Sequence, residues 1–157
     1  MRSVLNEKQK GLAAVEFILT VPLLLIILVA VLEISRAFVQ YTEMTKNLQN
    51  AVRFGVTNAY TTLTPYDHAP ESEIKNIALY GVASPSVDAN TNEITSPKLI
   101  DSMDLNDITV VVPLGAASPN LLVTASVEYS PLFSTIPFTT IDLNFNMTSS
   151  AMMRAGP

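Results

Sequence analysis

The sequence predicts an α+β, pilin-like fold in which a long N-terminal helix packs on a small C-terminal antiparallel sheet with one short extra helix. Three observations predict it. An uninterrupted apolar run fills residues 12–32, helical spacing of apolar side chains follows it, and strand-like segments occur only after residue 107. At 157 residues the chain has room for one modest globular part beyond such a helix.

The apolar run is long enough to cross a membrane. Only Glu16, Thr20 and Pro22 in it fall outside the apolar set. About 20 helical residues, each rising 1.5 Å, cross a hydrocarbon core of roughly 30 Å. A cleaved secretory signal has an apolar core of only about 7 to 15 residues and ends at a small-residue cleavage site. The run therefore favours a retained transmembrane helix over a signal peptide.

The charges on either side of the run indicate its orientation. Three basic residues and one acid precede it: Arg2, Lys8, Lys10 and Glu7. This excess favours a cytoplasmic N-terminus and an extracytoplasmic remainder. Removing these four from the totals of nine basic and fourteen acidic residues leaves a net charge of −7 from residue 12 onward. Nucleic acid is not an expected partner, since phosphate contacts need a basic surface.

Two residues inside the run need a physical reason. A carboxylate at the depth of Glu16 costs about 2.5 to 3.5 kcal/mol on insertion scales, so it indicates a specific partner or function. The alternative is that Gly11 is a helix N-cap and Glu16 is protonated or faces water near the interface. Pro22 removes one backbone donor and clashes with the carbonyl of Ile18, which predicts a kink or local melting. Neighbouring helices can also satisfy the backbone groups that this proline frees, and this explanation is an equal alternative to a functional hinge.

Beyond the run, apolar side chains recur at alternating steps of four and three, which is typical of one helical stripe. The helix is expected to continue to about Asn58 and to cover one face of the sheet. The expected stripe consists of Ile34, Phe38, Tyr41, Thr45, Leu48, Val52, Gly55 and Ala59. The residues expected to cover the sheet are Phe38, Tyr41, Leu48 and Val52.

The remaining elements are short. Loop residues fill 60–70, and a helix of two to three turns is expected from Pro70 to Gly81, with proline and acids at its start. Turn residues dominate from 84 to 107. Three β-branched or alternating segments then predict an antiparallel meander: residues 108–114, 121–129 and 141–152.

No enzyme is expected. His68 is the only histidine, cysteine is absent, and no serine lies in a Gly-x-Ser-x-Gly elbow, so no catalytic residue or cofactor is proposed. Acidic clusters at 88–93 and 101–107 suggest calcium only weakly. The first has Glu93 where a calcium loop needs its turn glycine and Leu99 where it needs its closing glutamate. The second is more typical of a solvated turn, so no metal is expected.

Four motifs together carry a family resemblance. They are Gly11-Leu-Ala-Ala-Val-Glu16-Phe17, Val21-Pro22-Leu-Leu-Leu, Glu33-Ile-Ser-Arg36-Ala37-Phe38 and the closing Thr148-Ser-Ser-Ala-Met-Met-Arg154. They resemble the TadE-like minor pilins of tight-adherence (Flp) pili, within the type IV pilin and pseudopilin class. The resemblance covers about residues 10–56 and 121–154.

This resemblance implies processing and charge pairing. A prepilin peptidase would cut the Gly11–Leu12 bond on the cytoplasmic side and remove residues 1–11 as a leader. The new α-amino group of Leu12 would be largely cationic at neutral pH and would pair with Glu16 of an adjacent subunit. Two unit charges 4 Å apart gain about 4 kcal/mol at an effective dielectric of 20, which offsets the insertion cost. Phe17 belongs to the same assembly motif.

The implied product has an N-terminal helix over residues 12–58, transmembrane over 12–32 and amphipathic over 33–58, and a periplasmic domain over 59–157. Leu12 stands where many type IV pilins have phenylalanine, so N-methylation does not follow from the resemblance. The chain is also longer than the short major pilins, which favours a minor role. The periplasmic domain would extend from a single pass through the inner membrane.

The implied function is assembly of a tight-adherence pilus used in surface adhesion and biofilm formation. The implied partners are the prepilin peptidase, other minor pilins, the major pilin and the inner-membrane assembly platform. One alternative is a membrane-tethered extracytoplasmic binding protein or adhesin with no assembly role. A tethered enzyme is a third, less favoured hypothesis.

Overall fold

The computed structural model describes residues 2–58, 68–89, 91–113, 118–133, 135 and 143–155, with side chains from Ala13 onward. The chain divides into two compact units. One comprises Met1–Ala37 and Pro131–Leu143, and the other comprises Phe38–Ser130 and Asn144–Pro157. Helix α1, Arg2–Asn58, contributes residues to both.

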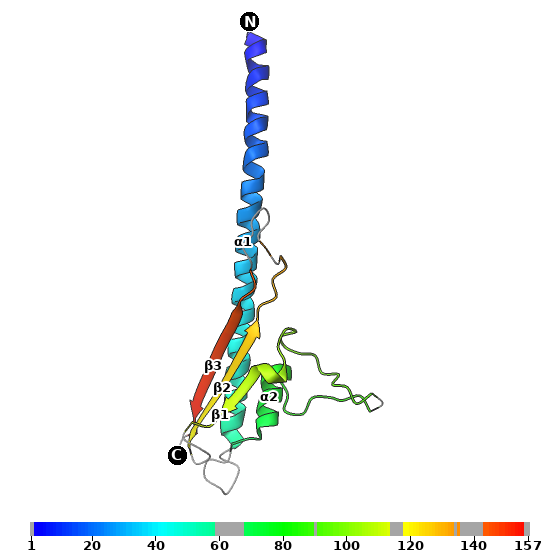
Figure 1. Cartoon of the computed structure of the whole chain (residues 1–157), viewed down its shortest axis with the longest axis vertical. Helices are drawn as coiled ribbons and strands as arrows, with labels where there is room; N and C mark the ends of the chain where they lie inside the picture. Colours follow the sequence, from blue (N-terminus) through cyan, green and yellow to red (C-terminus); the bar gives the residue numbers. More distant parts are fainter. Residues whose placement is uncertain are drawn as a thin grey trace. The chain divides into compact units, whose positions relative to one another are not determined.

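The second unit confirms the α+β prediction. It contains α2 (Glu71–Tyr80), the 3-10 turn η1 (Leu105–Asp107) and the strands β1 (Ile108–Val111), β2 (Asn120–Glu128) and β3 (Asn146–Arg154). The strands form one antiparallel sheet in the order β1-β2-β3, which is the predicted meander. Figure 1 shows β2 between its two neighbours and α2 beside the C-terminal end of α1.

The end of β1 and the start of β3 differ most from the predicted strand boundaries, because strand pairing ends near proline. β1 ends at Val111, just before Pro113, and Leu114 lies outside the described residues. β3 begins at Asn146 instead of 141, because its partner β2 ends at Glu128, shortly before Pro131. Proline cannot donate to a strand ladder, so alternation alone does not extend the sheet past it.

The core of the second unit lies between the sheet and the last part of α1. Alternate residues of β2 are buried, in the pattern expected of a strand with one covered face. They are Leu121, Val123, Ala125 and Val127, followed by Tyr129. The buried residues of α1 in this unit are Met44, Leu48, Ala51, Val52, Gly55 and Val56.

The predicted stripe of α1 is correct only in its second half, of which Ala59 lies outside the described residues. Leu48 and Val52 are buried as predicted, whereas Phe38 and Tyr41, which were expected to cover the sheet, are 68% and 42% exposed. Ile34 is also exposed. A nine-residue strand spans roughly 30 Å, less than the about 37 Å of helix between residues 34 and 58. Periodicity identifies the apolar face of a helix but not the length of it that a sheet covers.

Gly55 is the point of closest approach among three elements. A Cβ atom on Gly55 would lie 2.4 Å from Leu121 Cδ2 of β2 and 2.9 Å from Ile74 Cδ1 of α2. The carbonyl of Gly55 accepts a hydrogen bond from the Ala69 amide at 3.1 Å, just before α2 begins. The absence of a side chain therefore lets α1, α2 and β2 pack together.

Helix α2 has the predicted start and end. Pro70 precedes it, Glu71 and Glu73 lie in its first turn, and Gly81 ends it in the left-handed conformation at φ 75°. Acids near a helix N-terminus interact favourably with its dipole, and glycine adopts a positive φ at little cost. The buried residues of α2 are Ile74, Ala78 and Leu79.

In the first unit α1 is continuous through Pro22, so local melting at this residue is not observed. The predicted kink stays a prediction. The helix also begins well before Gly11, at Arg2, so the alternative in which Gly11 is the N-cap is wrong for the full-length chain. The predicted loop at 60–70 lies outside the described residues up to residue 67.

Candidate functional site

The candidate site is the exposed N-terminal half of α1, where the sequence placed a processing site and a charge pair. Gly11 and Leu12 lie within α1, and the side chain of Leu12 is outside the described part. Glu16 is exposed on the helix surface. None of the ion pairs among the described residues involves it. Glu16 is therefore a carboxylate available to a partner outside this chain.

The surface around Glu16 is apolar on all sides of the helix. Phe17 is 68% exposed, and large apolar side chains are exposed along the whole segment to Leu32. Soluble monomers rarely expose continuous apolar surface beyond a few hundred Å². Lipid or another protein must cover this surface in the cell.

Among the described helices, α1 alone is long and apolar enough to cross a membrane. Only 6% of its most apolar stretch is buried, which excludes the core helix of a soluble protein as its explanation. A helix that is apolar all round and unburied by its own chain is typical of a membrane span. The protein thus carries one candidate N-terminal span, consistent with single-pass anchoring.

Glu33 has a role that the sequence did not indicate. Its side chain is buried, with 4% exposure. Its Oε1 accepts a hydrogen bond from the backbone amide of Phe133 at 3.1 Å, within the first unit. No local pattern reveals a contact between residues one hundred positions apart.

His68 holds two segments of the second unit together. Its Nε2 lies 3.1 Å from the carbonyl oxygen of Ser118. Because a carbonyl only accepts, Nε2 carries a proton, and Nδ1 is buried with no partner in the described structure. The contact is explained by packing of the chain and needs no catalytic role.

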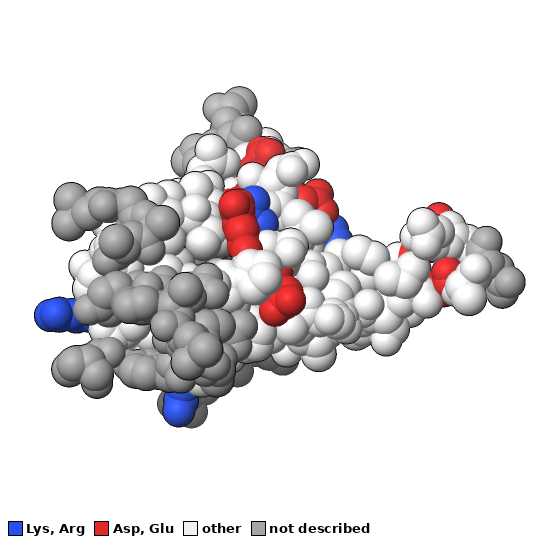
Figure 2. All heavy atoms as spheres, turned by 90° about the horizontal axis from the view of Figure 1, so that it is seen from below, with Lys and Arg blue, Asp and Glu red and all other residues white. Residues whose placement is uncertain are grey.

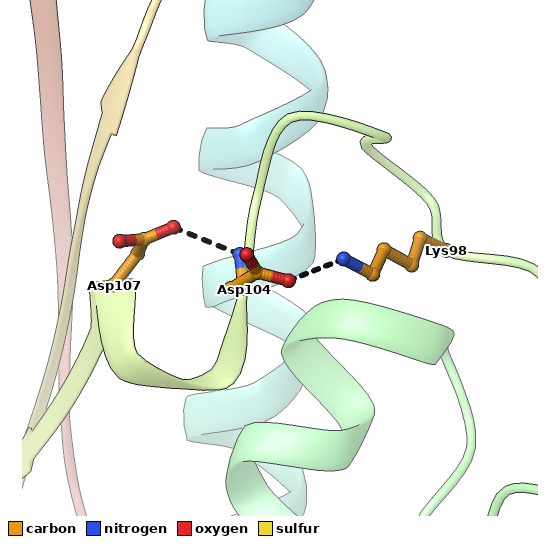
Figure 3. Close-up of polar contacts among 3 residues, drawn as sticks. All are labelled: Lys98, Asp104 and Asp107. Carbon is orange, nitrogen blue, oxygen red and sulfur yellow. Dashed lines mark hydrogen bonds and ion pairs between the residues drawn. The ribbon is translucent and has the colours of Figure 1, made fainter. Parts of the chain in front are cut away.

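The acidic cluster at 101–107 is engaged in local structure, as Figure 3 shows. Lys98 donates to a carboxylate oxygen of Asp104, and the Asp104 amide donates to Asp107 Oδ2 at 2.8 Å. The latter bond is half of a capping box around η1. The hydrogen bond to Asp104 raises the pKa of Lys98, with a smaller contribution from the negative charges of its neighbours.

The other acidic cluster forms a backbone turn. The Asp88 amide donates to the Glu93 carbonyl and the Asn92 amide to the Asp88 carbonyl, each at 2.9 Å. Asn92 adopts φ 57°, which asparagine tolerates better than most residues. Nowhere in the described ranges do three or more potential metal ligands gather. Figure 2 shows acidic side chains beside basic ones on the visible face, without a continuous basic patch.

An open depression lies beside α2. Its lining residues are Glu71, Ser72, Lys75, Asn76, Leu105 and Asn106. The ammonium of Lys75 is already paired with Glu71 at 2.9 Å. The depression is open to solvent, whereas ligand sites usually enclose most of the ligand, so the apolar helix surface with Glu16 is the stronger candidate site.

These features define an α+β protein with one candidate membrane span at its N-terminus. Comparison with known families then gives a more specific result. The model of the family described as TadE-like protein matches residues 11–56. The match begins at Gly11 and includes Glu16, Phe17 and Pro22. No curated protein and no solved structure matches the chain.

Proposed function

We propose that this chain is the precursor of a minor pilin of a tight-adherence pilus. A prepilin peptidase removes residues 1–11 by cutting the Gly11–Leu12 bond, and the mature chain takes part in pilus assembly. The observation that carries the proposal is Glu16, an exposed carboxylate on an apolar helix surface, within a TadE-like match that begins at Gly11.

Processing supplies the partner that Glu16 lacks within the described chain. Hydrolysis of the Gly11–Leu12 bond leaves a cationic α-amino group on Leu12. When this amine comes from a neighbouring subunit and lies about 4 Å from the carboxylate, the pair gains about 4 kcal/mol at an effective dielectric of 20. That gain exceeds the about 2.5 to 3.5 kcal/mol cost of placing the carboxylate in the bilayer. The pair thus fixes the axial offset between neighbouring helices.

The proposed location follows from the same helix. The span lies in the inner membrane with the basic N-terminus in the cytoplasm, because Lys and Arg are retained on that side. The remainder of the chain faces the periplasm. The partners are the prepilin peptidase, other minor pilins, the major pilin and the inner-membrane assembly platform, and the pilus serves adhesion and biofilm formation.

Mass analysis of the protein from membranes with and without the peptidase tests the processing step. We expect peptidase-dependent loss of residues 1–11 and a mature chain that begins at Leu12. A bulky substitution, Gly11→Val, should block the cut, whereas Lys10→Ala should not. A chain that keeps Met1 in cells with active peptidase would contradict the proposal.

Pilus counts test the assembly step. Glu16→Gln keeps the size of the side chain and removes its charge, so we expect far fewer pili, with processing intact. Glu43→Gln is the matched control, because Glu43 is also exposed on α1 but lies outside the apolar segment. Normal pili in the Glu16→Gln strain would favour a tethered binding protein with no assembly role.

A further inference from the structure

The segment after β2 contacts α1 at the point where the proposed membrane span ends. Glu33 is the first residue after the predicted span 12–32, and its Oε1 accepts the amide of Phe133 at 3.1 Å. Both residues belong to the first unit. The hydrogen bond therefore holds the backbone of Phe133 at the level where α1 leaves the hydrocarbon core, provided that the span of the proposed function is correct.

At this level the segment exposes its apolar side chains. Leu132 is 66% exposed and Phe133 45% exposed, although the backbone of Phe133 is tied to the buried Glu33. On α1 itself, Leu32 and Ile34 are 54% and 70% exposed. The apolar surface of the span thus continues onto the contacting segment.

The sequence around these residues is suited to lipid. Residues 129–141 contain no charged side chain, although acidic residues predominate in the chain beyond the leader. The described residues 131–133 lie outside any helix or strand. Backbone of this kind does not enter the hydrocarbon core, because its polar groups would lose their partners there. At the headgroup level those groups reach water, while leucine and phenylalanine reach the acyl chains.

We propose that Leu132 and Phe133 form a shallow membrane contact beside α1, at the interface on the side where the helix emerges. Glu33 is a positioning residue for this contact, since its carboxylate holds the amide of Phe133 at the correct depth. The occupant of the surface is the lipid bilayer. The observations favour lipid over a second protein because the exposed residues continue the surface of the span at a depth fixed by a hydrogen bond.

The chain has no tryptophan, so one substitution introduces a unique fluorophore. Phe133→Trp keeps the backbone amide that Glu33 accepts and replaces one aromatic side chain with another. The full-length protein is reconstituted in vesicles of phosphatidylcholine and phosphatidylglycerol, with bromine at a shallow or a deep acyl position. We expect at least twofold quenching by the shallow bromine and weaker quenching by the deep one.

Leu19→Trp separates this proposal from the proposed function. Leu19 lies within the span and is 71% exposed, so its tryptophan should be quenched most strongly by the deep bromine. Quenching at Leu19→Trp without quenching at Phe133→Trp overturns the membrane contact and leaves the span intact. Absence of quenching at both positions overturns the span and the contact together.

A pair of second-site variants tests the role of Glu33. In the Phe133→Trp protein, Glu33→Gln retains an oxygen that accepts the amide, and quenching should persist. Glu33→Ala removes the acceptor, and quenching by the shallow bromine should fall at least twofold. Equal quenching in the two variants overturns the positioning role. Tryptophan emission that is shielded from bromine and rises with the protein-to-lipid ratio would assign the surface to a second copy of this chain instead.

Discussion

The hydrogen bond between Thr45 and Ser149 gives the sharpest test of how α1 packs on the sheet. Thr45 Oγ1 donates to the Tyr41 carbonyl at 2.9 Å, which uses its single proton. The Ser149 hydroxyl must therefore donate to Thr45 Oγ1, at 2.9 Å. Ser149 is 5% exposed on the covered face of β3. Thr45→Val keeps the shape of the side chain and leaves the serine hydroxyl buried without this acceptor.

The expected magnitudes follow from the cost of an unsatisfied hydroxyl. A buried polar group that loses its partner costs about 1 to 3 kcal/mol, and a satisfied hydrogen bond contributes about 0.5 to 1.5 kcal/mol net. We expect Thr45→Val to lower the free energy of unfolding of the second unit by about 1 to 2 kcal/mol. Ser149→Ala removes the serine hydroxyl itself, so no buried hydroxyl of Ser149 is left without a partner. The double variant should lose less than the sum of the two single losses, by roughly 0.5 to 1.5 kcal/mol.

The assay is hydrogen exchange of the β2 amides in the full-length protein in detergent micelles, because β2 pairs with β3 throughout its length. Thr42→Val is the matched control, since Thr42 Oγ1 donates to the Val39 carbonyl at 2.7 Å from an exposed position of the same helix. Equal losses in the Thr45 and Thr42 variants, or strictly additive losses in the double variant, would refute this account of the contact.

Three further predictions concern single residues. Gly55→Ala should destabilise the second unit by about 1 to 2 kcal/mol in urea pulse proteolysis, because moving the buried Leu121 costs more than the added helix propensity gains. The site of Gly81 has room for the methyl group of Gly81→Ala. The left-handed backbone at φ 75° should nevertheless lower the free energy of unfolding of this variant by about 1 to 2 kcal/mol, and that of Gly81→Asn by less. The hydrogen bond to Asp104 raises the pKa of Lys98 in the folded state. The contribution of this hydrogen bond to stability is therefore present below the ordinary pKa of 10.5 and is lost as pH rises through the raised pKa. NMR titration of Lys98 should show that Asp104→Asn moves its pKa back toward 10.5, and an unchanged pKa would contradict the assignment.

Local chemistry explains which elements could be predicted from the sequence. Helix α2 was predicted because proline, acids and glycine act within one turn of its ends. The strand order was predicted because strands that follow one another in the chain usually pair as neighbours in a sheet. The start of β3 at Asn146 could not be predicted, because it depends on where β2 ends, and residues 143–145 alternate as well as those that pair.

The candidate site also has a part that could be predicted from the sequence and a part that could not. The span and Glu16 were found from composition, since a lone carboxylate in an apolar run is a local anomaly that needs no knowledge of the fold. The contact of Glu33 with Phe133 could not be predicted, because the partner is a backbone amide, which has no side-chain signature in the sequence. A buried acid with a backbone partner looks identical in sequence to a solvated one.

The error in the helical stripe and the proposed assembly role have a common explanation. From Leu48 to Gly55 the stripe of α1 is buried within the chain, whereas Phe38, earlier in the same stripe, is 68% exposed. Pairing of Glu16 with the amine of a neighbouring subunit requires the N-terminal helices to lie side by side. A stripe that is continuous in sequence would then be buried in two ways, against neighbouring chains in its first half and against its own sheet in its second. Single-chain packing accounts for Leu48 and Val52, and the proposed assembly would cover the residues that this packing leaves exposed.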